Sequence, residues 1–167
     1  MVTLVLGGAR SGKSEVAERL AARAGGPVTY LATYSPPACL SDDDMAGRVE
    51  AHRRRRPPEW TTVEAGLGLP AALDAVAGPA LVDSLGTWVA AHEDFAVDTA
   101  ALCGALARRR DPTVVVSEEV GMGVHPSTES GRLFRDALGA LNTAVATVAG
   151  QVMLVVAGRV LPLEPPG

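Results

Sequence analysis

The residues best suited to do chemistry form a glycine-rich stretch near the start of the chain, GGARSGKS, at residues 7–14. It fits the pattern G-x-x-x-x-G-K-[ST] and lies between an apolar run and a segment of helical period, as a phosphate-binding loop requires. Backbone N–H groups of such a loop form an anion nest, and the dipole of the following helix adds positive potential. A chance glycine-rich turn is the alternative, which the context on both sides disfavours. We therefore expect a nucleoside triphosphate to contact Gly7, Gly8, Ala9, Arg10, Ser11, Gly12, Lys13 and Ser14.

Lys13 is unusual in the composition of the chain. Of the 15 Lys and Arg residues, 14 are arginine and Lys13 is the only lysine. An ammonium group acts as a compact point charge, which a planar guanidinium does not imitate. We expect Lys13 to act as a catalytic residue that reaches the β- and γ-phosphates, and we expect the Ser14 hydroxyl to be a ligand for Mg²⁺.

An acidic residue at the end of a neighbouring strand should complete the metal site. Asp83 closes the apolar run PALVD and is the best candidate, although aspartates at strand ends also cap the segment that follows. Glu118 and Glu119 follow TVVVS and compete for the same task, and one of them could orient an acceptor hydroxyl. The residues thus predict phosphoryl transfer with Mg²⁺ held by Ser14 and Asp83. They do not identify the acceptor.

A second reactive segment, RVEAHRRRRPPEW, places a histidine directly before a run of arginines in a chain of formal net charge -4. Positive side chains are favourable at a helix C-terminus, so a solvated helix end is the simpler interpretation. Guanidinium forks also suit triphosphate oxygens, and neutral imidazole can attack phosphorus to give a phosphoramidate. Spacing alone favours the surface histidine and leaves the nucleophile open. The residues concerned are His52, Arg53, Arg54, Arg55 and Arg56.

The elements that must position these residues follow an α/β pattern. Short apolar, β-branched runs alternate with longer segments of helical period, which predicts a largely parallel sheet flanked by helices. The runs are apolar nearly throughout, as strands covered on both faces must be. We expect strands at residues 2–6, 28–33, 79–83, 113–117 and 152–156. We expect helices at residues 13–24, 43–56, 68–77, 98–109 and 130–149.

Local signals mark some ends of these elements. Ser41 and Asp44 stand at capping-box spacing before the helix at 43–56, and Asp98 is placed to cap the helix that follows it. Proline pairs on either side set the helix at 43–56 apart as an excursion between strands. The tail LPLEPPG, at residues 161–167, is expected to be irregular.

Composition limits the remaining possibilities. A chain of 167 residues with 47% hydrophobic and 20% charged residues fits one globular domain, which we expect to span residues 1–167. Its acidic balance argues against a nucleic-acid partner. Cys39 and Cys103 lack metal-ligand or redox spacing and suit small buried hydrophobes. No signal peptide or membrane span is recognisable, so a cytoplasmic protein is expected.

Several segments together carry a family resemblance. RVEAHRRRRPPEW fits R-[IV]-x-x-H-x-x-x-R-P-x-x-W, EVGMG fits E-V-G-x-G, and FRDALGALN fits F-R-D-x-x-G-x-x-N, in that order after GGARSGKS. With VTYLAT, LVDSLGTW and VMLVVAG they cover nearly the whole chain. The sequence therefore resembles the bifunctional adenosylcobinamide kinase and adenosylcobinamide-phosphate guanylyltransferase family of cobalamin biosynthesis.

The resemblance implies two reactions. A nucleoside triphosphate, ATP or GTP, first phosphorylates the aminopropanol hydroxyl of adenosylcobinamide. GTP then donates GMP to that phosphate through a guanylylated histidine, releasing pyrophosphate. The matching histidine is His52, and the arginines beside it would stabilise departing pyrophosphate. The resemblance further implies nucleotide contacts at Ala32, Thr33, Tyr34, Arg53, Arg54, Arg55, Arg56, Glu64 and Asp83.

The same resemblance implies a RecA-like P-loop domain and a homotrimer with active sites at subunit interfaces. The chain departs from the family pattern at two places. Residues 83–86 are D-S-L-G where relatives often carry D-C-L-T, and residues 118–121 are E-E-V-G where relatives often carry N-E-V-G. Gly86 thus replaces a threonine and Glu118 an asparagine. A small-molecule P-loop kinase without guanylyl transfer and a non-catalytic nucleotide-dependent switch are the alternative functions.

Other prominent side chains receive simpler interpretations. His92 and His125 are expected to be surface or loop histidines, although His125 could touch substrate. Trp60 should pack against the base of the arginine segment, and Trp88 should lie in the core or an interface. The arginines at 108–110 suit a solvated helix end. Two further arginines lie one helical turn apart and could hold an anionic part of a substrate or pair across a subunit contact; they are Arg132 and Arg135.

Overall fold

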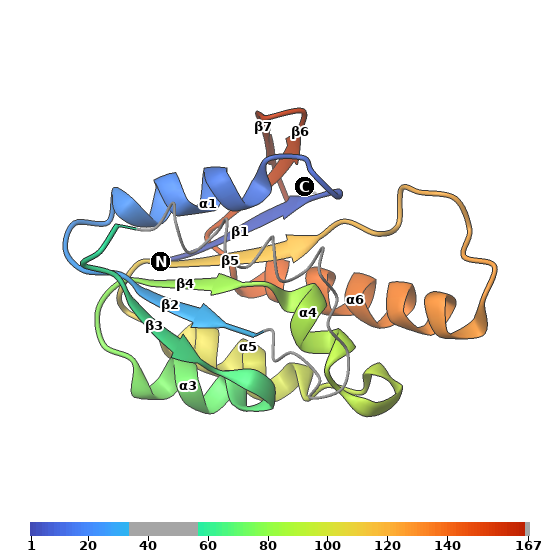
Figure 1. The fold of residues 1–167 in the computed structure, drawn as a ribbon, viewed down its shortest axis with the longest axis horizontal. Helices are drawn as coiled ribbons and strands as arrows, with labels where there is room; N and C mark the ends of the chain where they lie inside the picture. The colour runs from blue at the N-terminus through green and yellow to red at the C-terminus, as the bar shows by residue number, and fades with distance from the viewer. Residues whose placement is uncertain (34–56, 166–167) are drawn as a thin grey trace.

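The structure, a computed structural model, describes residues 1–33 and 57–165 (Figure 1). The helix expected at 43–56 and its capping pair therefore lie outside the described residues. So do several residues named above as candidates: Tyr34, Cys39, His52, Arg53, Arg54, Arg55 and Arg56. Within the described ranges, no helix combines the length and apolar character that a membrane span requires.

In the described part of the chain, seven strands form one sheet in the order β3-β2-β4-β5-β1-β6-β7. The strands are β1 (Val2–Gly7), β2 (Thr29–Ala32), β3 (Thr61–Glu64), β4 (Ala80–Asp83), β5 (Thr113–Glu118), β6 (Gln151–Val156) and β7 (Arg159–Leu163). Only β6 and β7 pair antiparallel; the other neighbours are parallel. The expected α/β class with a largely parallel sheet flanked by helices is confirmed, and β5 lies between β1 and β4.

Helices cover both faces of the sheet (Figure 1). One face carries α1 (Lys13–Ala22), and the opposite face carries α3 (Leu69–Ala75), α4 (Leu85–Ala90), α5 (Thr99–Arg108) and α6 (Glu129–Val148). Two short 3-10 turns precede α3 and α5, namely η1 (Gly66–Gly68) and η2 (Glu93–Phe95). The helices expected at 13–24, 68–77, 98–109 and 130–149 are therefore confirmed. Asp98 caps α5 as expected, because its Oδ1 accepts a hydrogen bond of 2.8 Å from the Ala101 N–H.

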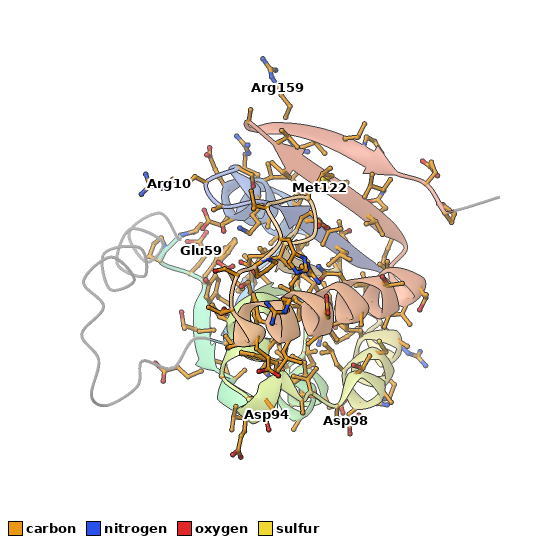
Figure 2. The ribbon with its side chains drawn as sticks, turned by 90° about the vertical axis from the view of Figure 1, so that its right-hand side faces the viewer. Arg10, Glu59, Asp94, Asp98, Met122 and Arg159 are labelled. Atoms are coloured by element: carbon orange, nitrogen blue, oxygen red, sulfur yellow. The ribbon has the colours of Figure 1, made fainter. Side chains whose placement is uncertain are left out.

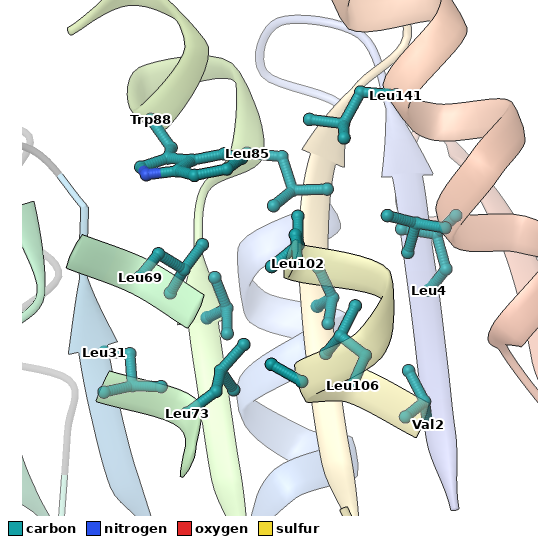
Figure 3. Close-up of a cluster of buried hydrophobic side chains, with 14 of the residues drawn as sticks. Val2, Leu4, Leu31, Leu69, Leu73, Leu85, Trp88, Leu102, Leu106 and Leu141 are labelled. Carbon is teal, nitrogen blue, oxygen red and sulfur yellow. The ribbon is translucent and has the colours of Figure 1, made fainter. Parts of the chain in front are cut away.

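Successive side chains along a strand point to opposite faces of the sheet, and this divides the core into two clusters. Leu4 and Leu6 of β1 face the larger cluster under α3 to α6, whereas Val5 faces the smaller one under α1. Trp88 is fully buried in the larger cluster, which confirms its predicted core position (Figure 3). Cys103 packs against the same cluster, and partial burial raises the pKa of its thiol, so it behaves as a small apolar residue.

Among the residues that the structure describes, two strands and one helix were not predicted from the sequence. β3 is mostly exposed and polar, and β7 is exposed throughout and contains Pro162, so neither resembles a buried strand. The irregular tail expected from residue 161 is wrong, because residues 161–163 belong to β7, which returns along β6 after a turn with positive φ at Ala157 and Gly158. The helix α4 is only six residues long and contains Gly86, which weakens its helical pattern.

The expected solvated helix end at residues 108–110 is wrong for Arg109. Its guanidinium donates to the carbonyls of Leu73, Val76 and Gly78 and to the Thr113 hydroxyl. It thereby closes the loop between α3 and β4 against the start of β5. Arg108 does lie in solvent, where it forms an ion pair with Asp74 that lowers the pKa of the carboxyl and raises that of the guanidinium.

Replacing Arg109 should therefore destabilise the fold. We expect Arg109→Ala to lower the free energy of unfolding by about 2 kcal/mol, because several carbonyls lose a charged donor. Urea denaturation measures the change. The matched variant Arg108→Ala should cause a much smaller loss, because its ion pair is exposed. Equal losses in the two variants would contradict the role given to Arg109.

Candidate active site

The phosphate loop joins the end of β1 to the start of α1, as the sequence predicts. Gly12 adopts φ 91°, a left-handed conformation that only glycine adopts without strain, and α1 begins at the next residue. The Ser11 carbonyl accepts a hydrogen bond of 2.8 Å from the Gly158 N–H, so the β6–β7 turn supports the loop. Arg10 also has positive φ and extends from the loop into solvent (Figure 2).

Lys13 lies at the base of this loop with only 11% of its side chain exposed. Its Nζ donates to the Gly8 carbonyl at 3.3 Å and lies 3.6 Å from Oε1 of Glu118. The ammonium is thus held at the junction of β1, α1 and β5, and Ser14 follows it in the first turn of α1.

Parallel pairing brings several candidate residues to the same edge of the sheet. Gly7 lies opposite Glu118 in the β1–β5 register. Ala32 lies opposite Asp83 on one side and opposite Glu64 on the other. The carboxyl ends of these strands therefore form the edge next to the phosphate loop, where α/β proteins bind ligands.

Asp83 does not cap the segment after it, which was the alternative to the metal role. Ser84 is the N-cap of α4, and its side chain accepts from the Thr87 N–H. The Asp83 carboxylate instead accepts a hydrogen bond of 2.8 Å from the Tyr30 hydroxyl. The described residues contain no cluster of three or more His, Cys, Asp or Glu that could hold an ion. Ser14 and Asp83 still suit Mg²⁺, because this ion commonly binds through one or two carboxylates and substrate phosphates.

The other nucleotide contacts implied by the resemblance lie at the ends of β2 and β3. The side chain of Thr33 is fully buried, and its hydroxyl contacts the Ser84 carbonyl at 2.7 Å and the Thr87 hydroxyl at 2.6 Å. Thr33 thus braces the turn between β4 and α4. Ala32 is half-buried and Glu64 is exposed, both at the same edge.

The two departures from the family pattern meet in space. The Glu118 carboxylate accepts from the Ser84 hydroxyl at 3.0 and 3.1 Å and from the Gly86 N–H at 3.0 Å. Asn142 of α6 donates to the Glu118 carbonyl at 3.0 Å and accepts from the Ser117 hydroxyl at 2.6 Å. These two hydrogen bonds to the end of β5 explain why the FRDALGALN motif ends in an asparagine. Sequence spacing could not show the contact between residues 86 and 118.

The segment after β5 carries exposed apolar side chains. Met122 is 75% and Val124 is 95% exposed, and Figure 2 shows Met122 on the loop that leads to α6. Arg135 of α6 contacts His125 Nδ1 at 2.9 Å, and Arg132 donates to the Pro126 carbonyl at 3.2 Å. Both arginines thus brace this loop from α6. His125 is exposed there and His92 lies in the bend after α4, both as expected; the His92 Nδ1 contacts the Trp88 carbonyl at 2.8 Å.

The fold and this edge define a P-loop nucleotide-binding protein of the α/β class. A more specific assignment comes from sequence comparison. The model of the cobinamide kinase / cobinamide phosphate guanyltransferase family matches residues 3–163, and the chain belongs to this family. The resemblance seen in the motifs is therefore confirmed.

The relatives match over nearly their whole lengths. The bifunctional adenosylcobalamin biosynthesis protein CobP of Pseudomonas aeruginosa is 40% identical over 173 residues, which cover 98% of each chain. The bifunctional adenosylcobalamin biosynthesis protein CobU of Escherichia coli is 35% identical over 180 residues, covering 95% of this chain and 97% of its own. The CobU protein of Salmonella typhimurium has the same identity and coverage. Among solved structures, the P4 protein of bacteriophage phi6 in complex with ADP has a TM-score of 0.42 and 14% identity, and the match covers 95% of this chain and 52% of that chain.

The conformation of the loop predicts a sharp difference between two of its glycines. Gly12→Ala should lower the free energy of unfolding by about 1–2 kcal/mol, because a side chain is strained at its left-handed φ. Gly8→Ala is the matched control, since a Cβ there meets no atom within 4 Å. Its free energy of unfolding should stay within about 0.5 kcal/mol of the parent. Urea denaturation without nucleotide measures both, and equal destabilisation would contradict the loop conformation.

Proposed function

We propose that this chain phosphorylates the aminopropanol hydroxyl of adenosylcobinamide with ATP or GTP and then transfers GMP from GTP to the resulting phosphate. The observation that carries the proposal is the phosphate loop beside the acidic ends of β4 and β5, in a chain that matches the family from residue 3 to residue 163. Its relatives are named bifunctional adenosylcobalamin biosynthesis proteins at 35–40% identity.

In the kinase step, the loop N–H groups from Gly7 to Ser14 bind the phosphates, and Lys13 neutralises charge on the transferred group. The acceptor oxygen bonds to the γ-phosphorus as the bond to the β-phosphate oxygen breaks, and the hydroxyl proton leaves to a base. Ser14 and Asp83 would hold Mg²⁺, which supplies charge neutralisation of the phosphate oxygens when bound. Of the nucleotide contacts that the family resemblance implies, Ala32, Tyr34 and Glu64 would touch the donor nucleotide, whereas Thr33, which is fully buried, would act by bracing the turn after β4.

In the guanylyl step, a ring nitrogen of His52 attacks the α-phosphorus of GTP and the bond to pyrophosphate breaks. The phosphate oxygen of the corrinoid then attacks the same phosphorus, and the phosphorus–nitrogen bond breaks to release the histidine. The neighbouring arginines stabilise the departing pyrophosphate, since guanidinium groups bind such oxygens in pairs. This step is supported by the motif that contains His52 and by the names of the relatives.

We further propose that residues 1–167 form a single domain and that the enzyme is a cytoplasmic homotrimer with active sites at subunit interfaces. The support for assembly is the exposed apolar surface of the β6–β7 hairpin at Val156, Val160, Leu161 and Leu163. Exposed apolar edges of this kind favour association with another chain. The cytoplasm is where the required triphosphates are available.

The guanylyl step predicts a covalent intermediate on one histidine. Incubation with GTP labelled at the α-phosphate should give an acid-labile, alkali-stable label on the protein, as a phosphoramidate requires. His52→Ala should abolish the label, while His92→Ala should retain it, because His92 lies in the bend after α4 and its ring bonds to the Trp88 carbonyl. No label on the parent chain, or equal label on His52→Ala, would favour the alternative of a kinase alone.

The kinase step depends on the single lysine. Lys13→Ala should lower the rate of cobinamide phosphorylation by about 100-fold or more, because the transferred phosphate loses its fixed positive partner. Transfer of label from the γ-phosphate of the donor to cobinamide measures the rate. Undiminished transfer by a folded Lys13→Ala variant would overturn the role of the loop, and binding of GTP without any corrinoid-dependent turnover by the parent would favour the non-catalytic switch.

A further inference from the structure

We propose that Glu118 and Gly86 act as one unit that holds Lys13 before nucleotide binds. Glu118 is a positioning residue whose carboxylate pairs with the ammonium of Lys13, and Gly86 leaves the space that this carboxylate needs. When a triphosphate enters the loop, Lys13 exchanges the carboxylate for a phosphate oxygen. The inference rests on the proposed placement of the triphosphate in the loop at residues 7–14.

The first observation is the ion pair itself. Lys13 Nζ lies 3.6 Å from Oε1 of Glu118, and the two side chains are 11% and 28% exposed. Partial burial leaves this pair less screened than a pair at the open surface. The ammonium also donates to the Gly8 carbonyl at 3.3 Å. The Glu118 carboxylate is therefore paired with the same ammonium group that would otherwise bind the phosphates of a nucleotide.

The second observation is that Glu118 is held from the other side by β4 and α4. Ser84 Oγ lies 3.0 Å from Oε1 and 3.1 Å from Oε2, and the Gly86 N–H lies 3.0 Å from Oε2. These donors come from the turn that follows Asp83, whereas Lys13 comes from the phosphate loop. The carboxylate thus connects the two parts of the site across the end of β5.

The third observation concerns Gly86. A Cβ built on this residue would overlap Oε2 of Glu118 and lie 2.8 Å from its Cδ, a separation that real Cβ atoms essentially never show. Gly86 is not among the glycines with positive φ, so its backbone does not require glycine. Glycine is required at position 86 because a side chain there would collide with the Glu118 carboxylate. A side chain at 86 and this position of the Glu118 carboxylate exclude each other.

The arrangement fixes the sign of the effect on binding. A triphosphate is anionic, so a carboxylate beside Lys13 both competes for the ammonium and repels the incoming phosphates. Removing the negative charge should therefore tighten binding. Loss of a merely structural side chain would weaken binding or leave it unchanged, so the direction separates the two roles.

Calorimetric binding of the non-hydrolysable analogue β,γ-methylene-GTP to the whole chain tests the proposal. Glu118→Gln, which keeps the size of the side chain and removes its charge, should bind about fivefold to tenfold more tightly, with and without Mg²⁺. The matched control is Glu15→Gln, whose carboxylate pairs with Arg19 in solvent at 3.3 Å. Its affinity should stay within about twofold of the parent. Glu118→Asn provides a second, smaller charge-removing variant if Glu118→Gln does not fold.

A double-mutant cycle tests the coupling between the two positions. Gly86→Ala should also change the affinity, because a methyl group there takes the space of Oε2 and forces the Glu118 carboxylate out of its present position beside Lys13. In a chain that already carries Glu118→Asn, whose side chain is shorter, adding Gly86→Ala should change the affinity for the analogue by less than about twofold. Effects that simply add in the double variant would overturn the coupling.

The outcomes also separate this inference from the proposed function. Unchanged or weaker binding of the analogue by Glu118→Gln overturns the inference. Weaker binding that is seen only with Mg²⁺ also overturns it, and would indicate that the carboxylate is a metal ligand. If Lys13→Ala loses binding while Glu118→Gln equals the parent, the inference alone is wrong. If Lys13→Ala binds as well as the parent, the triphosphate does not lie in the loop and the proposed function is wrong in that respect.

Discussion

The site depends on one constraint: parallel strands of one sheet end at the same edge. The loop follows β1, while β5 ends in Glu118 and β4 ends in Asp83. Pairing of Gly7 with Glu118 and of Ala32 with Asp83 brings these residues together from distant parts of the chain. A slip of one residue in either register would turn these side chains to the opposite face of the sheet. The chemistry of the edge therefore depends on how firmly the strands are held.

Packing on both faces holds the strands in register. Leu4 and Leu6 contribute to one apolar cluster and Val5 to the other, so β1 is buried between two layers of helix (Figure 3). A hydrogen bond from Asn142 then anchors the end of β5 to α6, and Thr33 braces the turn after β4. Apolar burial positions the strands, and a few buried polar contacts position their functional ends.

The central strands were predictable because a buried parallel strand is a continuous apolar run whatever its partners are. The two outermost strands were not. TTVE and RVLPL are polar or interrupted by proline, and they are strands only because β2 and β6 offer them an unpaired edge. Arg109 shows the same limit, since a charged residue at a helix end resembles a solvated one until the carbonyls around it are known. Family resemblance supplied the role of His52, which spacing alone did not favour.

The sequence by itself determined the phosphate loop, its lysine and the family, because the glycine conformation, the helix start and the ordered motifs are properties of contiguous residues. The tertiary structure decided how Asp83 and Glu118 are used. It showed that Ser84, and not Asp83, caps α4, and that Glu118 shares its carboxylate between Lys13 and a turn 32 residues away in the chain. Such contacts depend on which strands are neighbours and on the space left by Gly86. Neither can be predicted from the spacing of residues along the chain.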